Sequence, residues 1–265
     1  SASTPARAGP VSPATARFAA LLSPQGKILY DFFVTEAEEA DGGGFYLDAP
    51  RVLCRDLAQR LAMYKLRADV TIEDMSDALG IGAVVGTAEY DPLDYLAFGD
   101  PRLPALGTRL IGERSRLEAI GGDVRTYHAH RISLCVPEGG KDFAYSDAFP
   151  HETLMDQLGG VDFAKGCYVG QEVVSRMQHR SSARTRIMQA VYPEGFAAME
   201  GLDVVADGKI IGRTGSQHKG RGLVLIRLDK LADAVAAGHP VMAGGIVMTV
   251  ERPAYATFPL VPGQS

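Results

Sequence analysis

The chain has 265 residues, of which 46% are hydrophobic and 22% are charged, and its formal net charge is −5 at pH 7. This is ordinary globular composition, and the length allows one large domain or two smaller ones, each with its own core. The net charge excludes a global basic field. We therefore expect neither nucleic acid nor a membrane surface as a partner.

Cysteine usage narrows the class of protein further. Cys54, Cys135 and Cys167 are far apart, with no C-x-x-C pair and no Cys/His spacing typical of zinc, so we predict no metal site. A sparse, odd set of thiols suits a reducing compartment. No apolar run approaches the roughly 20 residues that span a bilayer, and residues 1–5 lack the apolar core of a secretory signal. We expect a cytosolic or organelle-matrix protein.

Residues 1–14 are rich in Ala, Ser and Pro and predict a flexible N-terminus. Turn and capping residues then divide residues 15–186 into short elements of an α+β body, with a subdomain break near 100–110. The turn signal at 23–26 between two apolar runs predicts a β-hairpin. In chain order we expect strands at 16–22, 27–34, 45–47, 66–72, 83–86 and 108–111, and helices near 50–64, 124–131, 151–158 and 172–179.

After Arg186 glycines, short β-rich runs and turn pairs dominate the sequence. The pair Asp207-Gly208 indicates a type I′ hairpin. We interpret residues 187–258 as a small C-terminal β-barrel and 259–265 as a tail. Its expected elements are strands at 202–205, 209–213, 223–228, 240–242 and 246–250, and a helix at 230–237.

The most specific motif is the octapeptide KGCYVGQE at residues 165–172. Lys165 stands two positions before the thiol of Cys167, and a helical run follows the motif. A nearby cation and a helix N-terminus both stabilise a thiolate, so the motif has a physical reason to be reactive or to hold an anion. The alternative for Cys167 is an inert, buried cysteine. Cys54 and Cys135 adjoin apolar runs and are interpreted as structural.

This octapeptide, together with Arg176, resembles the motif of the YgfZ/IBA57 family, a folate-binding branch of the aminomethyltransferase (glycine-cleavage T-protein) superfamily. Further stretches resemble family landmarks in the same order, and the collinear matches cover about residues 15–255. These stretches are the PQGK turn at 24–27, the segment 64–70, Asp100-Pro101-Arg102, and the FPHE segment at 149–152.

The resemblance implies an aminomethyltransferase-like folate-binding body with a central channel, beside the C-terminal barrel. It implies tetrahydrofolate or a one-carbon derivative as the ligand, and a role in the assembly or repair of iron–sulfur proteins. Partners would then be reduced folate and iron–sulfur assembly or client proteins. A stably bound cluster is not expected, because cluster sites usually want four thiolates. The compartment would be the bacterial cytoplasm or the mitochondrial matrix of a eukaryote.

The resemblance also assigns candidate site residues. Cys167, at the rim of the channel, and Asp31 are the candidate catalytic residues. Each candidate binding residue has a structural alternative: Lys165 pairs with the glutamyl tail or is solvated, Tyr168 stacks on the pterin or belongs to the core, and Glu172 binds the pterin or supports the helix dipole. The candidate cofactor-binding residues are Lys165, Gly166, Tyr168, Gly170, Gln171, Glu172 and Arg176.

Arg176, Arg180 and Arg184 recur every four residues and would repel one another on one helix face. Either they lie near a helix C-terminus, or a polyglutamate tail or acidic partner compensates them.

Two departures weaken the case for full aminomethyltransferase activity. Transferring relatives carry an Asp-Asp pair where this chain has Tyr30-Asp31, and a glutamate where it offers Ser133. The leading hypothesis is a tetrahydrofolate-binding accessory protein of iron–sulfur assembly. The alternatives are a folate-dependent aminomethyltransferase or demethylase, and a non-catalytic interaction module that has lost the ligand.

Overall fold

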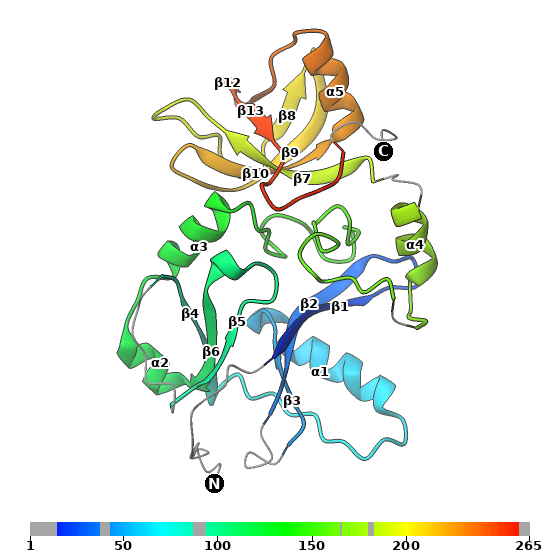
Figure 1. The fold of residues 1–265 in the computed structure, drawn as a ribbon, viewed down its shortest axis with the longest axis vertical. Helices are drawn as coiled ribbons and strands as arrows, with labels where there is room; N and C mark the ends of the chain where they lie inside the picture. The colour runs from blue at the N-terminus through cyan, green and yellow to red at the C-terminus, as the bar shows by residue number, and fades with distance from the viewer. Residues whose placement is uncertain (1–14, 38–42, 87–93, 165, 180–182, 260–265) are drawn as a thin grey trace. The chain divides into compact units, whose positions relative to one another are not determined.

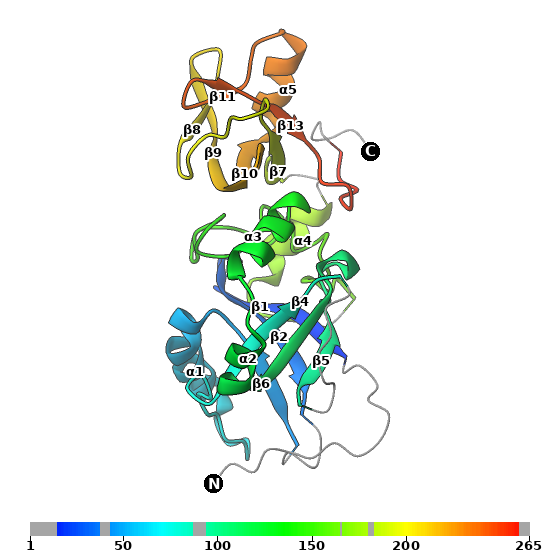
Figure 2. The ribbon, with the colours of Figure 1, turned by 90° about the vertical axis from the view of Figure 1, so that its left-hand side faces the viewer.

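The computed structural model describes residues 15–37, 43–86, 94–164, 166–179 and 183–259. These residues form two compact units (Figures 1 and 2). The first unit takes its described residues from 15–20 and 30–124, and the second from 21–29 and 125–259.

Two three-stranded sheets build the first unit. The first sheet has the order β1-β2-β3, and the second is antiparallel with the order β4-β6-β5. The predicted hairpin and the strand near 108–111 are confirmed. The strands are β1 (Ala16–Leu22), β2 (Ile28–Glu36), β3 (Phe45–Asp48), β4 (Leu79–Val84), β5 (Leu96–Gly99) and β6 (Thr108–Glu113).

Two buried arginines flank one aromatic ring in the first unit. The guanidinium carbons of Arg102 and Arg109 lie 4.8 and 4.3 Å from the ring centroid of Phe33. Arg102 pairs with Asp100 at 2.7 Å, and the Nε of Arg109 donates to Asp48 at 2.9 Å. Because each buried cation has a carboxylate partner, this cluster satisfies its own charge.

The helices of the first unit are α1 (Arg51–Lys65) and α2 (Arg114–Ile120), with a short 3-10 turn at Pro104–Leu106. Leu117 of α2 packs over Gly80 and Gly82 of β4, where a Cβ at either glycine would lie 3.1 Å from its methyl groups. The predicted strand at 66–72 is wrong. Leu66 ends α1 with φ 49°, and the residues after it are exposed and outside any helix or strand, so no neighbouring strand stabilises an extended ladder.

After residues 21–29, the second unit resumes with α3 (Val124–Ser133), continues through loops and turns, and reaches α4 (Gln171–His179). The predicted helices near 124–131 and 172–179 are confirmed. The predicted helix at 151–158 is wrong, because residues 150–159 form successive turns. Leu154 has φ 63°, a left-handed conformation that a right-handed helix does not accept.

The barrel of the second unit is one seven-stranded sheet with the order β12-β11-β8-β9-β10-β7-β13. Asp207 and Gly208 have φ 50° and 67°, which confirms the type I′ turn between β8 and β9. Helix α5 (Leu228–Ala236) follows β10 and contacts it (Figure 2). The strands are β7 (Thr185–Val191), β8 (Asp203–Ala206), β9 (Lys209–His218), β10 (Arg221–Arg227), β11 (Met242–Ala243), β12 (Ile246–Val247) and β13 (Thr249–Glu251).

Within the described part of the chain, no helix is long and apolar enough to span a bilayer.

Candidate functional site

Glycine contacts fix the motif loop against the tip of the β1–β2 hairpin (Figure 1). Gly170 has φ +84°, and a Cβ there would lie 2.7 Å from the carbonyl oxygen of Ser23 and 2.8 Å from the Cα of Gly26. Gly26 has φ +81°, and its Cβ would lie 3.1 Å from the Cβ of Val173. Both positions therefore need glycine, for conformation and for space.

The hairpin tip also contacts the FPHE landmark. The N–H of Ile28 donates to the carbonyl oxygen of Ala148 at 3.0 Å, and Ser146 N–H donates back to Ile28 at 2.7 Å. Lys27 pairs with Asp147 at 2.8 Å, and its ammonium lies 5.4 Å from the ring centroid of Phe149. The fold thus gathers three landmarks that are far apart in sequence: the PQGK turn, the segment around Phe149, and the motif.

Helix α4 begins within the motif, and local contacts hold its first turn. The backbone N–H of Tyr168 donates to Oε1 of Gln171 at 3.1 Å, and the N–H of Gln171 donates to the carbonyl oxygen of Tyr168 at 3.2 Å. Arg176 pairs with Glu172, one helical turn away, at 2.6 Å. The polar groups of Gln171, Glu172 and Arg176 thus have structural partners. Their assignment to a cofactor stays a prediction.

Cys167 is the exposed thiol of the described chain, whereas Cys54 is half-buried and Cys135 is buried. Burial raises the pKa of the Cys135 thiol well above its ordinary value, so this side chain stays protonated. A Cβ on Gly166 would meet no atom within 4 Å, so the approach to Cys167 from this side is open. Lys165 lies outside the described residues. The ring of Tyr168 is half-buried.

The second candidate catalytic residue belongs to the other unit. Asp31 lies half-buried on β2 within the first unit, whereas Cys167 belongs to the second, and each is described within its own unit. Ser133 ends α3, and its hydroxyl donates to the carbonyl oxygen of His130 at 2.7 Å. Its role is that of a helix-end hydroxyl.

Sequence reasoning missed His151, a buried residue that contacts α4. Its Nε2 lies 3.0 Å from Oε1 of Gln178, and its Nδ1 has no hydrogen-bond partner among the described residues. Burial lowers the pKa of His151, although the carboxylate of Asp156 opposes the effect. The ring therefore stays neutral and donates from Nε2 to α4.

Arg186 joins the barrel to the residues around His151. Its guanidinium donates to both oxygens of Asp156, at 2.9 and 3.1 Å, and to the carbonyl oxygen of His151 at 2.9 Å. The ring of Phe258 lies 4.2 Å from its central carbon. In the predicted arginine repeat, Arg176 has a partner within α4, Arg184 is exposed, and Arg180 lies outside the described residues.

Arg131 is a further buried arginine that sequence reasoning missed. Nη1 of Arg131 donates to Asp142 at 2.7 Å, and Nη2 donates to the hydroxyl of Ser216 at 2.8 Å. Nε lies 3.0 Å from a carboxylate oxygen of Glu138. A Cβ at Gly215 would lie 2.6 Å from Asp142, so glycine admits the carboxylate. The signal in the sequence was an arginine beside the apolar run that contains Cys135.

Among the described residues, no group of three or more His, Cys, Asp or Glu side chains converges as metal ligands do. Cys167 therefore offers a single thiolate.

Known families and structures resemble this chain along most of its length. The family described as "CAF17, C-terminal beta-barrel domain" matches residues 184–258. The iron–sulfur cluster assembly factor IBA57 homolog of Pyricularia oryzae, named as mitochondrial, is 32% identical over 261 residues, which cover 86% of this chain and 67% of that protein. Human mitochondrial IBA57 is 29% identical, and the match covers 86% of this chain and 69% of the human protein.

Among solved structures, the aminomethyltransferase T of the glycine cleavage system from Bartonella henselae superposes with a TM-score of 0.64. The match covers 92% of this chain and 76% of that one, at 14% identity. At this identity the likeness concerns the fold, and it confirms the predicted aminomethyltransferase-like body with a C-terminal barrel.

Proposed function

The chain belongs to the YgfZ/IBA57 family, and from that premise we propose that it is an accessory protein of iron–sulfur cluster assembly or repair. Its relatives bear the name of iron–sulfur cluster assembly factors. Their names also place them in mitochondria, which supports the matrix as the compartment if this chain is eukaryotic. A bacterial chain would act in the cytoplasm.

The observation that carries the proposal is the exposed thiol of Cys167 on a fixed loop. The backbone approach of Gly170 to the hairpin tip holds the loop, and the capping contacts of Gln171 hold the helix that follows. A thiolate binds iron and sulfur, but one thiolate is far below the four that usually hold a cluster. Cys167 is therefore assigned a transient contact with sulfur or with a cluster.

Complementation tests this role. In cells that lack the gene, Cys167→Ala should fail to restore the activities of cluster-dependent enzymes, whereas Cys54→Ala should restore them. Both proteins must accumulate to the same level. Cys54 is the matched control because it is half-buried and its thiol lies against the carbonyl oxygens of Ala49 and Pro50. Equal rescue by both variants would remove Cys167 from the mechanism.

We further propose that the body binds tetrahydrofolate or a one-carbon derivative. The support is the likeness of its fold to an aminomethyltransferase, together with the family landmarks. The described polar groups of the motif already have local partners, so the proposal rests on the fold rather than on those groups. Calorimetric titration with reduced folates should show binding in the micromolar range. No heat at high micromolar concentration would contradict the folate proposal and leave the cluster proposal intact.

Folate binding without transfer is the form of the proposal that fits this sequence. Tyr30 stands where transferases have the first of two aspartates, and Ser133 is engaged at a helix end. Glycine-cleavage assays with the purified partner proteins check this. Turnover above background would assign transferase chemistry instead.

A further inference from the structure

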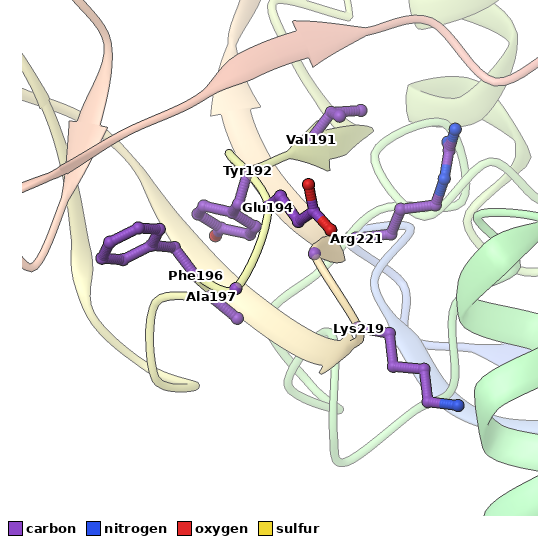
Figure 3. A pocket seen from close by; sticks show the side chains of 9 residues that line it. Val191, Tyr192, Glu194, Phe196, Ala197, Lys219 and Arg221 are labelled. Carbon is purple, nitrogen blue, oxygen red and sulfur yellow. The ribbon is translucent and has the colours of Figure 1, made fainter.

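Two adjoining depressions mark one side of the C-terminal barrel. The first has a volume of about 600 Å³ and is lined by residues from 191–197 and 219–221. The second, of about 520 Å³, is lined by residues from 197–200 and 217–219. Because Ala197 and Lys219 line both, the depressions form one elongated hollow, here called the barrel groove. Figure 3 shows Tyr192 and Phe196 on its loop side and Lys219 and Arg221 on the side of the β9–β10 turn.

The hydroxyl of Tyr192 is buried in the wall of the barrel groove. The residue is 5% exposed, and its hydroxyl has no hydrogen-bond partner among the described residues. Burial raises the pKa of Tyr192 to about 12, so the hydroxyl keeps its proton. A buried hydroxyl without a partner destabilises a fold.

The side-chain amide of Gln217 is also buried without hydrogen-bond partners. Both its Oε1 and its Nε2 are buried and have no partner within the described chain. Gln217 lies opposite Gly222 in the β9–β10 ladder. A Cβ at Gly222 would lie 3.0 Å from Cγ of Gln217 and 3.5 Å from Cε2 of Tyr192, so both side chains lie over the same glycine. One donor and one acceptor of an amide thus lie beside a phenol.

The turn at the edge of the groove has an unfavourable residue. Lys219 and Gly220 have φ 45° and 76°, the conformation of a type I′ turn, whose first central position favours Asn, Asp or Gly. Another such turn of the barrel has Asp207 at that position. Neither Lys219 nor Arg221 has an ion-pair partner among the described residues. A lysine kept at an unfavourable backbone angle, with its charge unpaired, points to use of that charge.

We propose that the barrel groove binds an extended peptide segment of a partner protein, with one peptide carboxylate held by Lys219 at the β9–β10 turn. A peptide group carries one N–H and one C=O, which match the acceptor and donor of the Gln217 side-chain amide. The ammonium of Lys219 supplies charge-assisted hydrogen bonds to the carboxylate, and the charge of Arg221 adds attraction at longer range. Glu194 and Glu200 also line the groove, so a single carboxylate fits better than a run of them.

Two further features favour a peptide over a compact ligand. Phe196 is 56% exposed and Met199 is 76% exposed, and both side chains belong to the loop wall of the barrel groove. Such residues provide adaptable apolar contacts to neighbouring side chains of a peptide. Residues 193–198 of the loop contain no helix or strand, whereas hydrogen bonds to Thr214 of β9 hold the loop at residues 199–202. Access of a peptide backbone to the buried amide therefore requires residues 193–198 to move aside.

The test uses the full chain without folate and an acetylated, amidated pentapeptide with one central glutamate among alanine and leucine residues. A counterpart with glutamine in place of glutamate is the charge control. A third peptide, without glutamate but with a free C-terminal carboxylate, separates a side-chain carboxylate from a chain terminus. NMR titration should shift the side-chain amide signals of Gln217 and the backbone signals of residues 219–221. The glutamate peptide or the free-carboxylate peptide should bind at least tenfold more tightly than the glutamine peptide.

Variants separate binding from folding. Gln217→Met, Tyr192→Phe and Lys219→Asn each remove an unfavourable feature, so each should keep or raise the melting temperature while weakening peptide binding at least fivefold. Lys230→Gln on α5 removes a charge outside the groove and should leave binding unchanged. Absence of shifts at millimolar peptide would overturn the proposal. So would a lower melting temperature of the Gln217 and Tyr192 variants with unchanged binding, because these groups would then serve the fold.

Discussion

Ser216 and Gln217 are neighbours on β9, yet their polar groups are in opposite situations. Ser216 donates its backbone N–H to Asp142 at 2.7 Å, and its hydroxyl accepts from Arg131 at 2.8 Å. The side-chain amide of Gln217 has no hydrogen-bond partner among the described residues. Successive side chains of a strand point to opposite faces, so one face of β9 joins a satisfied network and the other borders the barrel groove. Burial alone therefore does not show that a polar side chain serves the fold, whereas burial with every hydrogen-bond partner present does.

The largest effect is expected on the satisfied face. Arg131→Met removes the cation from a pair in which Arg131 is 1% and Asp142 0% exposed at the side chain, and it leaves the buried carboxylate with backbone N–H donors but without its cation. We expect the free energy of unfolding to fall by about 3–5 kcal/mol. Chemical denaturation measures it. Arg227→Gln breaks an exposed pair with Asp229 and should leave the free energy of unfolding nearly unchanged, because exposed ion pairs contribute little to stability. Equal losses in both variants would show that the buried Arg131–Asp142 pair stabilises the chain no more than the exposed pair does.

Two glycines of the motif offer a matched pair with a smaller expected effect. Gly170→Ala places a Cβ at φ +84° and 2.7 Å from a backbone oxygen, so we expect a loss of about 2–3 kcal/mol. Gly166→Ala meets no atom within 4 Å and should change stability by less than about 0.5 kcal/mol. Thermal or chemical unfolding distinguishes them. A larger loss of stability for Gly166→Ala than for Gly170→Ala would show that the loop is tightly packed around Gly166 instead.

The parts of the fold that local chemistry decides were predictable from the sequence. The hairpin turn at 23–26 and the Asp207-Gly208 turn have residues whose backbone preferences match the geometry, and both were predicted correctly. The helix predicted at 151–158 failed because Leu154 adopts a left-handed conformation that its sequence does not favour. Tertiary contacts, such as the N–H bond from Ile187 to Glu152 at 2.8 Å, fix this segment instead.

Only the part of the candidate site that lies within the octapeptide was predictable from the sequence. The octapeptide predicted the start of α4 and singled out Cys167. Helix α4 begins at Gln171, within the motif, and the thiol of Cys167 is exposed rather than buried, while its role stays a prediction. Ser216, one partner of Arg131, and Gln178, the partner of His151, come from segments distant in sequence, so no spacing rule indicates them. The groups around Gln217 carry no sequence signal at all, because the absence of a hydrogen bond appears only once the chain is folded.

His151 combines the situations of Ser216 and Gln217. Its Nε2 has a hydrogen-bond partner, whereas its Nδ1 has none among the described residues. Burial lowers its pKa below the ordinary value of 6.5. Below pH 6.5 the unfolded chain therefore binds the proton more readily than the folded chain, and the free energy of unfolding falls as the pH drops toward the folded-state pKa. Above pH 6.5 this contribution is constant.

We expect His151→Gln to be less stable than the parent at pH 7.5 and to approach it in stability at pH 5.5. Unfolding curves at several pH values measure the difference. Burial also shifts the pKa of Glu152 upward and that of His128 downward, but both proteins contain these groups, so their contributions cancel in the comparison. A difference that does not change between these pH values would show that His151 does not titrate with unfolding.

The smallest expected effect compares two of the barrel's type I′ turns, those at Asp207-Gly208 and Lys219-Gly220. Both turns pair a residue at φ 45–50° with a glycine, but one begins with Asp207 and the other with Lys219. Lys219→Asn should raise the free energy of unfolding by about 1 kcal/mol, because asparagine tolerates the left-handed conformation that lysine resists. Asp207→Lys should lower it by a similar amount.

The reciprocal substitutions make this a test of position rather than of charge. Asp207 also pairs with Lys209 at 3.0 Å in an exposed contact that contributes little to stability, and Asp207→Asn measures that contribution separately. If Lys219→Asn stabilises the chain and Asp207→Lys destabilises it, the lysine is retained at the groove at the expense of stability, as expected of a binding residue. If Lys219→Asn destabilises the chain, Lys219 makes a structural contact in solution. Its left-handed backbone conformation would then no longer indicate a binding role at the barrel groove.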